Sequence, residues 1–475
     1  MRGIGVSGAS TVVARGTYAG VYLWVVTLLT PSELGVVTIG LAVYTLLSLF
    51  KDFGLTPALI SRKTAGPEVV AASYSIRLII AGILAAIGFA SSIALSELFE
   101  QPDLRMVLVF VALAIVAEPL GFLSNAMLQR ELEFGKLAVT DIASSLALAA
   151  GSIAAGVLGF PILALFVGIA IASTSRTIVL LRIRPVSVET SKRNLRDWPL
   201  LSYGSKLVAT SAVVYLFTNL NVWVLGRTDI YALGFYGLAF LWATTPADIA
   251  AAALSRVMLP TYASLIRRNK GVFLGYLETL KHLSIGVLLL FIPLFLSSPF
   301  LIHALYGPTW DKAVPILLVL LFFGLLRTLL EPIGSLVLSL ERPGIILGTN
   351  LINLGIVAAL VVPIAASYGA LGCAYLLTVV YLSHILILWY IVLRQFDERS
   401  WTIFRVIAKP LISASVALGV GIALEVTTSA PYEELIAALA ASLVYLGVML
   451  TIAREDLNNA FVNVRKAFMI GRNDC

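Results

Sequence analysis

The segment 313–340 reads AVPILLVLLFFGLLRTLLEPIGSLVLSL, and its only charged side chains are Arg327 and Glu331. A helix of about 20 predominantly apolar residues is long enough to span the hydrocarbon core of a bilayer. Because lipid offers no hydrogen-bonding partners, a backbone inside it must satisfy its own N–H and C=O groups. The segment is therefore predicted to be a transmembrane α-helix.

Similar apolar runs recur along the whole chain of 475 residues. Hydrophobic residues make up 59% of it and charged residues only 12%, whereas soluble domains carry about 25% charged residues. The sequence therefore predicts an all-α polytopic membrane protein with about fourteen transmembrane helices. The predicted spans are 9–30, 35–57, 74–96, 104–127, 136–158, 160–181, 203–225, 231–258, 281–302, 313–340, 344–366, 369–393, 404–425 and 432–453.

The distribution of Lys and Arg predicts the orientation. If the N-terminus is cytoplasmic, most of the 33 basic residues fall on the cytoplasmic side, as the positive-inside rule requires. The outer loops then contain Arg105, Arg227 and Lys312. This pattern predicts a location in the cell inner membrane with both termini in the cytoplasm. It also explains the net charge of +7, so no nucleic-acid partner is expected.

Short sequence matches predict two copies of a six-helix unit. EPLG at 118–121 in the fourth span matches EPIG at 331–334 in the tenth, and LG at 34–35 before the second span matches LG at 233–234 before the eighth. Parallel repeats of this kind are typical of transporters that bind substrate between the repeats and work by alternating access. The predicted organisation is an N-terminal six-helix bundle at 1–181, a basic cytoplasmic linker at 182–202, a C-terminal six-helix bundle at 203–393, an extra helix pair at 394–453 and a cytoplasmic tail at 454–475.

Several short motifs near the ends of the predicted spans resemble those of a known family. They are LTPSELG at 29–35, DFGL at 52–55, RELEF at 130–134, LGR at 225–227 followed by LGFY at 233–236, and YGPTW at 306–310. The chain resembles, over nearly its whole length, the polysaccharide transporter (Wzx-type oligosaccharide flippase) family of the multidrug/oligosaccharidyl-lipid/polysaccharide flippase superfamily. The motifs are mostly structural and identify the family better than the substrate.

The resemblance implies a rocker-switch carrier. Such a carrier moves a polyprenyl-pyrophosphate-linked oligosaccharide from the cytoplasmic to the outer face of the membrane for cell-surface polysaccharide biosynthesis. The family often has an acidic residue in the polar part of the seventh span, where this chain has Asn219 and Asn221. This departure weakens a direct transfer of the family's ion coupling to this chain.

A sugar-pyrophosphate head is polar and anionic, so cationic and aromatic side chains inside the spans are the candidate substrate-binding residues. Arg15, Tyr18 and Tyr22 share one face of the first span, which offers a guanidinium for phosphate and flat rings for sugar. Lys206 and Arg327 are the further candidate cations. The alternative interpretation is that the cations near span ends extend to the lipid headgroups and the tyrosines pack.

Glu118, Asp248 and Glu331 are the candidate ion-coupling residues, because ionisable groups inside spans are costly and usually face a cavity. Burial favours the protonated form of a carboxylic acid, so such a group can respond to an ion gradient. The alternatives are that the first two cap backbone at adjacent prolines, and that Glu331 forms a structural ion pair with Arg327 one turn away. The sequence predicts no cofactor and leaves coupling to a proton or sodium gradient open.

The nearest alternative function is an ion-coupled drug/cation antiporter of the same superfamily, which usually has twelve spans. The extra helix pair and the cationic groups favour the flippase. The sequence contains no nucleophile motif, metal-ligand spacing or phosphate-binding glycine loop, so we expect no enzyme activity, no catalytic residues and no metal site. A scaffold of an export complex would not need charges in the spans of both halves. The expected partners are the polyprenyl-linked oligosaccharide and membrane lipids, with polysaccharide polymerase or export proteins as further candidates.

Overall fold

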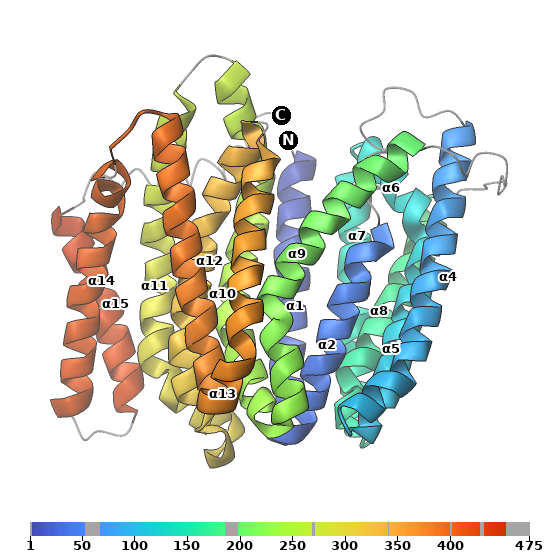
Figure 1. Ribbon diagram of the computed structural model, residues 1–475, viewed down its shortest axis with the longest axis horizontal. Helices are drawn as coiled ribbons and strands as arrows, with labels where there is room; N and C mark the ends of the chain where they lie inside the picture. Colours follow the sequence, from blue (N-terminus) through green and yellow to red (C-terminus); the bar gives the residue numbers. More distant parts are fainter. Residues whose placement is uncertain are drawn as a thin grey trace. The chain divides into compact units, whose positions relative to one another are not determined.

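The computed structural model describes residues 2–52, 67–185, 198–267, 271–340, 342–399, 401–427 and 432–452. Within these ranges the chain is almost entirely α-helical and forms no β-strand (Figure 1). Eleven helices in the described part are long and apolar enough to cross a membrane. The all-α polytopic membrane fold is therefore confirmed, while the number of fourteen spans stays a prediction. Most of the predicted linker 182–202, and all of the tail 454–475, lie outside the described residues.

The chain folds into two compact units, Met1–Gly237 and Leu238–Cys475. Helix α10 (Ile230–Arg267) contributes residues to both. The boundaries predicted for the two six-helix repeats stay predictions. The remaining helices of the N-terminal unit are α1 (Arg2–Val26), α2 (Pro31–Asp52), α4 (Pro67–Leu98), α5 (Pro102–Ala117), the 3-10 turn η1 (Glu118–Gly121), α6 (Phe122–Arg130), α7 (Phe134–Val157), α8 (Pro161–Ile183) and α9 (Trp198–Thr228).

The C-terminal unit contains the rest of α10 and the helices that follow it. Each predicted span overlaps a helix, and several helices extend beyond the predicted span: α10 continues past residue 258 to Arg267, and α11 begins at Val272, before residue 281. The helices after α10 are α11 (Val272–Tyr306), the 3-10 turn η3 (Pro308–Trp310), α12 (Ala313–Ser339), α13 (Pro343–Gln395), α14 (Trp401–Thr427) and α15 (Glu433–Ile452).

The spans predicted at 344–366 and 369–393 both lie on α13, which is divided at Gly369. This residue has φ 58° and ψ −146°, a backbone conformation that is open essentially only to glycine. The two helical segments therefore meet at a sharp kink without an intervening loop. The connection between α7 and α8 is also short, and its Gly159 has a φ of 88°.

Helices α2 and α10 begin with side-chain caps that fix the turns before them. Glu33 accepts a hydrogen bond from the Thr30 backbone N–H at 2.7 Å, and the Thr30 hydroxyl accepts one from the Glu33 N–H at 3.4 Å. This reciprocal arrangement is a capping box. Asp229 caps α10 by accepting a hydrogen bond from the N–H of Ala232 at 2.9 Å. The motifs before these helices thus have a structural role.

The two capped turns also pack against each other inside the N-terminal unit. A Cβ atom on Gly234 would collide with the backbone carbonyl of Pro31, and one on Gly35 would collide with the carbonyl of Ile230. Both positions therefore require the missing side chain of glycine for close backbone approach. The two LG dipeptides that the sequence pairs as repeat counterparts thus lie against one another.

The EP motifs of the predicted repeat differ in local structure. EPLG forms the 3-10 turn η1 between α5 and α6, whereas Pro332 lies inside an uninterrupted α12. Pro119 has no backbone N–H to donate. The hydroxyl of Thr177 on α8 donates to the carbonyl of Ala117 at 2.8 Å, next to the interruption. Glu118 is the first residue of this turn.

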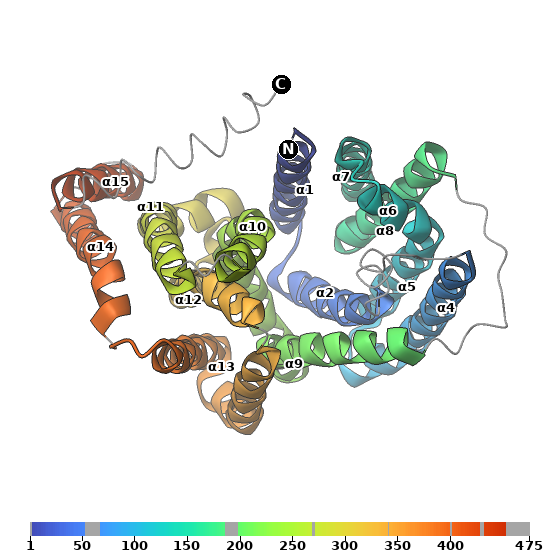
Figure 2. The same ribbon diagram turned by 90° about the horizontal axis from the view of Figure 1, so that it is seen from above.

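The extra helix pair α14–α15 packs on α11 of the C-terminal unit (Figure 2). Small residues let these helices approach closely, and the Tyr445 hydroxyl donates to the Ile285 carbonyl at 3.0 Å. The shared core contains Ile285, Leu288, Ile292, Leu296, Ala414, Ala417, Ala438, Ala441, Tyr445 and Met449.

Candidate functional site

Two polar cavities, each of about 280 Å³, lie among the helices of the N-terminal unit and share Glu118 and Arg176. The first is also lined by Lys51, Arg77 and Asn125, together with residues of α6 and α8. The second is lined by Tyr18 and Tyr44, which bring α1 and α2 to the same space, and by Ser144, Ser145 and Ser173. We call these two adjoining spaces the polar cavity.

An ion pair joins α2 to η1 across the polar cavity. The Nζ atom of Lys51 lies 2.7 Å from Oε2 of Glu118 and 2.9 Å from its Oε1. The side chains keep 26% and 22% of their surface exposed, so the pair can be reached from the cavity. The ring of Tyr44 lies 5.9 Å from the Lys51 ammonium, at the distance of a cation–π contact.

Arg77 of α4 adds a buried cation to this cavity. Only 6% of its surface is exposed, and its guanidinium carbon lies 5.1 Å from the centre of the Phe122 ring. It is close enough to Lys51 to act on it electrostatically. The Oδ1 atom of Asn125, another lining residue, is buried without a hydrogen-bond partner among the described residues. Buried polar atoms are normally paired, so this oxygen is an unusual feature of the cavity wall.

A second ion pair links α7 to α8 beside the cavity. Arg176 lies with Nη2 3.1 Å from Oδ1 of Asp141. The polar cavity and its edge therefore hold three cationic side chains, Lys51, Arg77 and Arg176, against two carboxylates, Glu118 and Asp141. The N–H groups of these cations are donors for charge-assisted hydrogen bonds with an anionic ligand.

The structure brings some of the predicted substrate-binding residues of α1 into this site. Tyr18 lines the cavity with Glu118, and Tyr22 packs edge-to-face on Tyr18 at a centroid distance of 6.3 Å. Arg15 is exposed on α1 and is not among the residues that line the described cavities. The side chain of Lys206 lies outside the described residues.

The C-terminal unit contains the other predicted residues. The Nη2 atom of Arg327 on α12 lies 2.6 Å from Oδ1 of Asp248 on α10, and the two side chains are 31% and 39% exposed. The ion pair of Arg327 therefore crosses to another helix instead of joining Glu331 one turn away. Tyr381 of α13 lies within electrostatic range of Arg327, Asp248 and Glu331, so these residues form one polar cluster.

Sequence reasoning missed Lys51, Arg77, Arg176 and Asp141 as site residues. Basic residues near predicted span ends satisfy the positive-inside rule, so they gave no separate signal. One signal was present in the sequence. Tyr44 and Lys51 are seven residues apart, so an aromatic ring and a cation lie on the same helix face.

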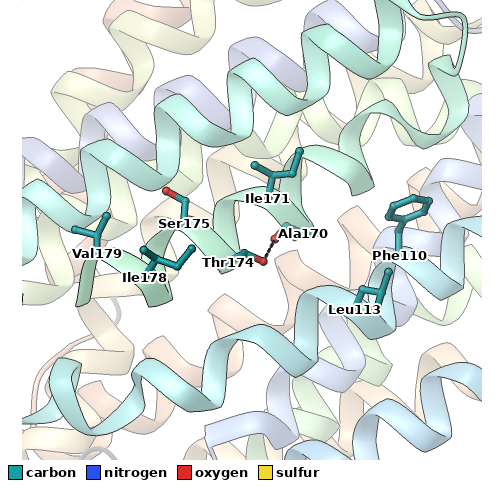
Figure 3. Close-up of a pocket in the computed structure, with 8 residues that line it drawn as sticks. All are labelled: Phe110, Leu113, Ala170, Ile171, Thr174, Ser175, Ile178 and Val179. Atoms are coloured by element: carbon teal, nitrogen blue, oxygen red, sulfur yellow. Dashed lines mark hydrogen bonds between the residues drawn. The ribbon is translucent and has the colours of Figure 1, made fainter. Parts of the chain in front are cut away.

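A third cavity, of about 510 Å³, is apolar and lies between α5 and α8 (Figure 3). Thr174 donates its hydroxyl to the Ala170 carbonyl at 2.8 Å, so its polar group is satisfied within its own helix. None of the eight lining residues is charged. Leu113, Ile171 and Ile178 are exposed, as expected for a surface that faces lipid. This cavity is unsuited to an anionic group.

An apolar groove of about 160 Å³ lies between α11, α12 and α14 in the C-terminal unit. Phe291 and Phe295 line it from α11, Phe322 lines it from α12, and Leu411 and Leu418 line it from α14. Helix α14 of the extra pair thus forms one wall of a groove with a mostly hydrocarbon surface.

Comparison with known proteins gives consistent matches. The family model described as "Polysaccharide biosynthesis protein" matches residues 25–315. A curated relative, the "Lipopolysaccharide biosynthesis protein WzxC" of Escherichia coli (strain K12), is 24% identical over 401 residues, which cover 82% of this chain and 81% of the relative.

Solved structures show the same fold. The solved structure of "Lipid II flippase MurJ, inward closed conformation" superposes on this chain with a TM-score of 0.76 at 16% identity. The match covers 94% of this chain and 99% of the solved chain. An inward-facing multidrug resistance MATE family transporter superposes with a TM-score of 0.63 at 13% identity. The match covers 84% of this chain and 95% of the transporter chain. At these identities the likeness shows the fold alone.

Proposed function

Because the chain belongs to the polysaccharide biosynthesis protein family, we propose that it carries a polyprenyl-pyrophosphate-linked oligosaccharide from the cytoplasmic to the outer face of the inner membrane by alternating access. The coarser role, a membrane transporter for polysaccharide biosynthesis, follows from the family and from the apolar helices. The finer substrate rests on the polar cavity of the N-terminal unit. The gathering of Lys51, Arg77 and Arg176 around this cavity is the observation that carries the proposal.

The polar cavity suits the head of such a substrate. Lys51 and Arg176 offer N–H donors to phosphate oxygens, and charge-assisted hydrogen bonds of this kind are stronger than neutral ones. Tyr18 and Tyr44 offer flat rings with a polar edge, which suits the faces and hydroxyl groups of sugars. The cavity thus combines the two chemistries that a sugar-pyrophosphate requires.

The apolar groove of the C-terminal unit suits the polyprenyl tail. Its Phe, Leu and Ile side chains offer dispersion contacts to a hydrocarbon chain, and Ser415 is the one polar residue in its lining. Helix α14 lines this groove, and the pair α14–α15 to which it belongs is additional to the two predicted six-helix repeats. A carrier of small water-soluble molecules would have no use for it.

The alternative, an ion-coupled drug/cation antiporter, is less well supported. A cationic drug would meet Lys51, Arg77 and Arg176 at the polar cavity, and like charges repel. The fold is shared with MATE transporters, so the fold does not separate the two functions. Ion coupling through Glu118, Asp248 and Glu331 remains part of the proposal, as does the orientation with both termini in the cytoplasm.

The proposal is tested by transport in proteoliposomes that contain only the purified chain. A radiolabelled polyprenyl-pyrophosphate oligosaccharide is loaded in one leaflet, and its arrival in the other is followed over time. We expect movement faster than in protein-free liposomes. Absence of movement, together with gradient-driven transport of a cationic dye, would replace this function with the antiporter.

A further inference from the structure

We infer that in the ion pairs Lys51–Glu118 and Arg327–Asp248, which join corresponding predicted spans in opposite order, each carboxylate is a resident counter-ion that the anionic substrate replaces. The inference rests on the proposed function, since it requires an anionic ligand. It goes further by assigning each carboxylate the role of a competitor with the phosphate for the neighbouring cation.

The positions of the two pairs match across the predicted repeat. Lys51 lies on the second predicted span and Glu118 on the fourth; Asp248 lies on the eighth span and Arg327 on the tenth. The second and eighth spans are repeat counterparts, and so are the fourth and tenth. In one unit the cation precedes the carboxylate in the chain, and in the other the order is reversed.

The register within the helices differs between the two pairs, because two residues are about 200° of rotation around an α-helix. Lys51 comes seventeen residues after Leu34, and Asp248 fifteen residues after Leu233, its repeat counterpart. Arg327 lies one helical turn before Glu331, the repeat counterpart of Glu118.

The pairs also lie at similar depths along their helices. At 1.5 Å per residue, Lys51 is about 30 Å and Asp248 about 27 Å from the first residue of its helix. On the same basis Glu118 is about 24 Å from the start of α5 and Arg327 about 21 Å from the start of α12. The two pairs thus agree in the predicted spans that they join and in approximate depth, but not in register.

A resident counter-ion solves an electrostatic problem of the empty carrier. A cation without a partner is costly away from water, and removing one member of a buried pair is strongly destabilising. The carboxylate therefore keeps Lys51 or Arg327 neutralised while no substrate is bound. A diphosphate can take the place of the carboxylate because it supplies the same kind of oxygen acceptor with more negative charge.

The geometry leaves room for such an exchange. Both pairs keep between 22% and 39% of their side-chain surfaces exposed, so a ligand can reach the ions. Each cation also has a hydroxylated ring nearby, Tyr44 for Lys51 and Tyr381 for Arg327. Arg77 stands near Lys51, and Glu331 stands near the second pair.

The test measures binding of farnesyl diphosphate to the full-length chain purified in detergent, with farnesol as the uncharged control ligand. Neutral variants Glu118→Gln and Asp248→Asn remove the competing charge. Because a charge-assisted hydrogen bond to the cation is then released, each variant should bind the diphosphate about tenfold more tightly than wild type. Glu131→Gln is the matched control, since Glu131 forms an exposed ion pair with Arg184 at 2.7 Å, and it should bind as wild type does.

A charge exchange within one pair gives a second readout. Lys51→Glu alone should weaken farnesyl diphosphate binding at least tenfold. The double variant Lys51→Glu/Glu118→Lys should restore it to within about threefold of wild type, because it recreates in the N-terminal unit the order that Asp248 and Arg327 have in the other. Thermal unfolding of each variant shows whether it is folded. If Glu118→Gln is not folded, farnesyl diphosphate binding by Asp248→Asn decides the test.

Two failures are distinguishable. If wild type binds farnesyl diphosphate no better than farnesol, the anionic substrate of the proposed function is contradicted. If wild type binds it and the folded amide variants bind equally well or more weakly, the carboxylates are structural partners and the counter-ion inference is overturned while the proposed function stands.

Discussion

The ammonium of Lys51 and the carboxylate of Glu118 lie 2.7 Å apart, although the two residues belong to helices that the sequence does not connect directly. Glu118 is the first residue of the 3-10 turn Glu118–Gly121, which lies between α5 and α6. The polar cavity thus lies beside a local backbone irregularity, from which Glu118 and Gly121 line it. In a membrane, irregular backbone of this kind is tolerated where it faces a cavity or packed protein.

The first prediction concerns the close approach of the two capped turns. Gly234→Ala places a Cβ atom against the carbonyl of Pro31, so the turn must shift. We expect a loss of about 1–3 kcal/mol in the free energy of unfolding, measured by unfolding of the purified protein in detergent. Gly20→Ala on α1 is the control, because a Cβ there meets no atom within 4 Å. Equal stability of Gly234→Ala and wild type would show that the approach is not tight.

The second prediction concerns the hydroxyl that supports the interrupted helix. Thr177→Val removes the donor to the Ala117 carbonyl and should lower the free energy of unfolding by about 1 kcal/mol. Thr174→Val, one turn earlier on α8, is the matched control. Its hydroxyl bonds within its own helix at an exposed position, so we expect a smaller change. The reverse ranking of the two variants in the same unfolding measurement would contradict this account.

The third prediction concerns the apolar groove. Ser415 lines the groove, so Ser415→Trp should fill it and slow transport of a long-chain polyprenyl substrate at least several-fold, while binding of the short farnesyl diphosphate stays as in wild type. Val416→Trp is the neighbouring control, because Val416 is exposed and is not among the groove residues. If both variants transport the long-chain substrate equally well, the tail lies elsewhere.

The sequence predicted the membrane class, the helix positions and the family, because these depend on apolar runs and local motifs. It also singled out Tyr18, Glu118, Asp248 and Arg327, which do line a cavity or form an ion pair. The reason is physical: polar groups inside a span are unfavourable unless something balances them.

The partners of these residues could not be predicted in the same way. Lys51 and Arg77 lie near span ends, where the positive-inside rule accounts for basic residues. Only the packing of α2 and α4 around η1 shows that they turn inward. For Arg327 the nearest carboxylate in sequence is Glu331, but helix packing brings Asp248 to it instead. Distances between helices are set by tertiary packing, which a single sequence with local patterns does not contain.

The most direct test of the account compares translocation of a polyprenyl-pyrophosphate oligosaccharide by wild type and Lys51→Met in proteoliposomes. The account predicts that wild type translocates it and that the folded variant loses at least tenfold in rate, because a cation for the diphosphate is gone. Lys136→Met is the control, since Lys136 pairs with Glu133 at an exposed position of α7 and should leave the rate unchanged. A Lys51→Met rate equal to that of wild type would contradict the assignment of the polar cavity to the substrate's head.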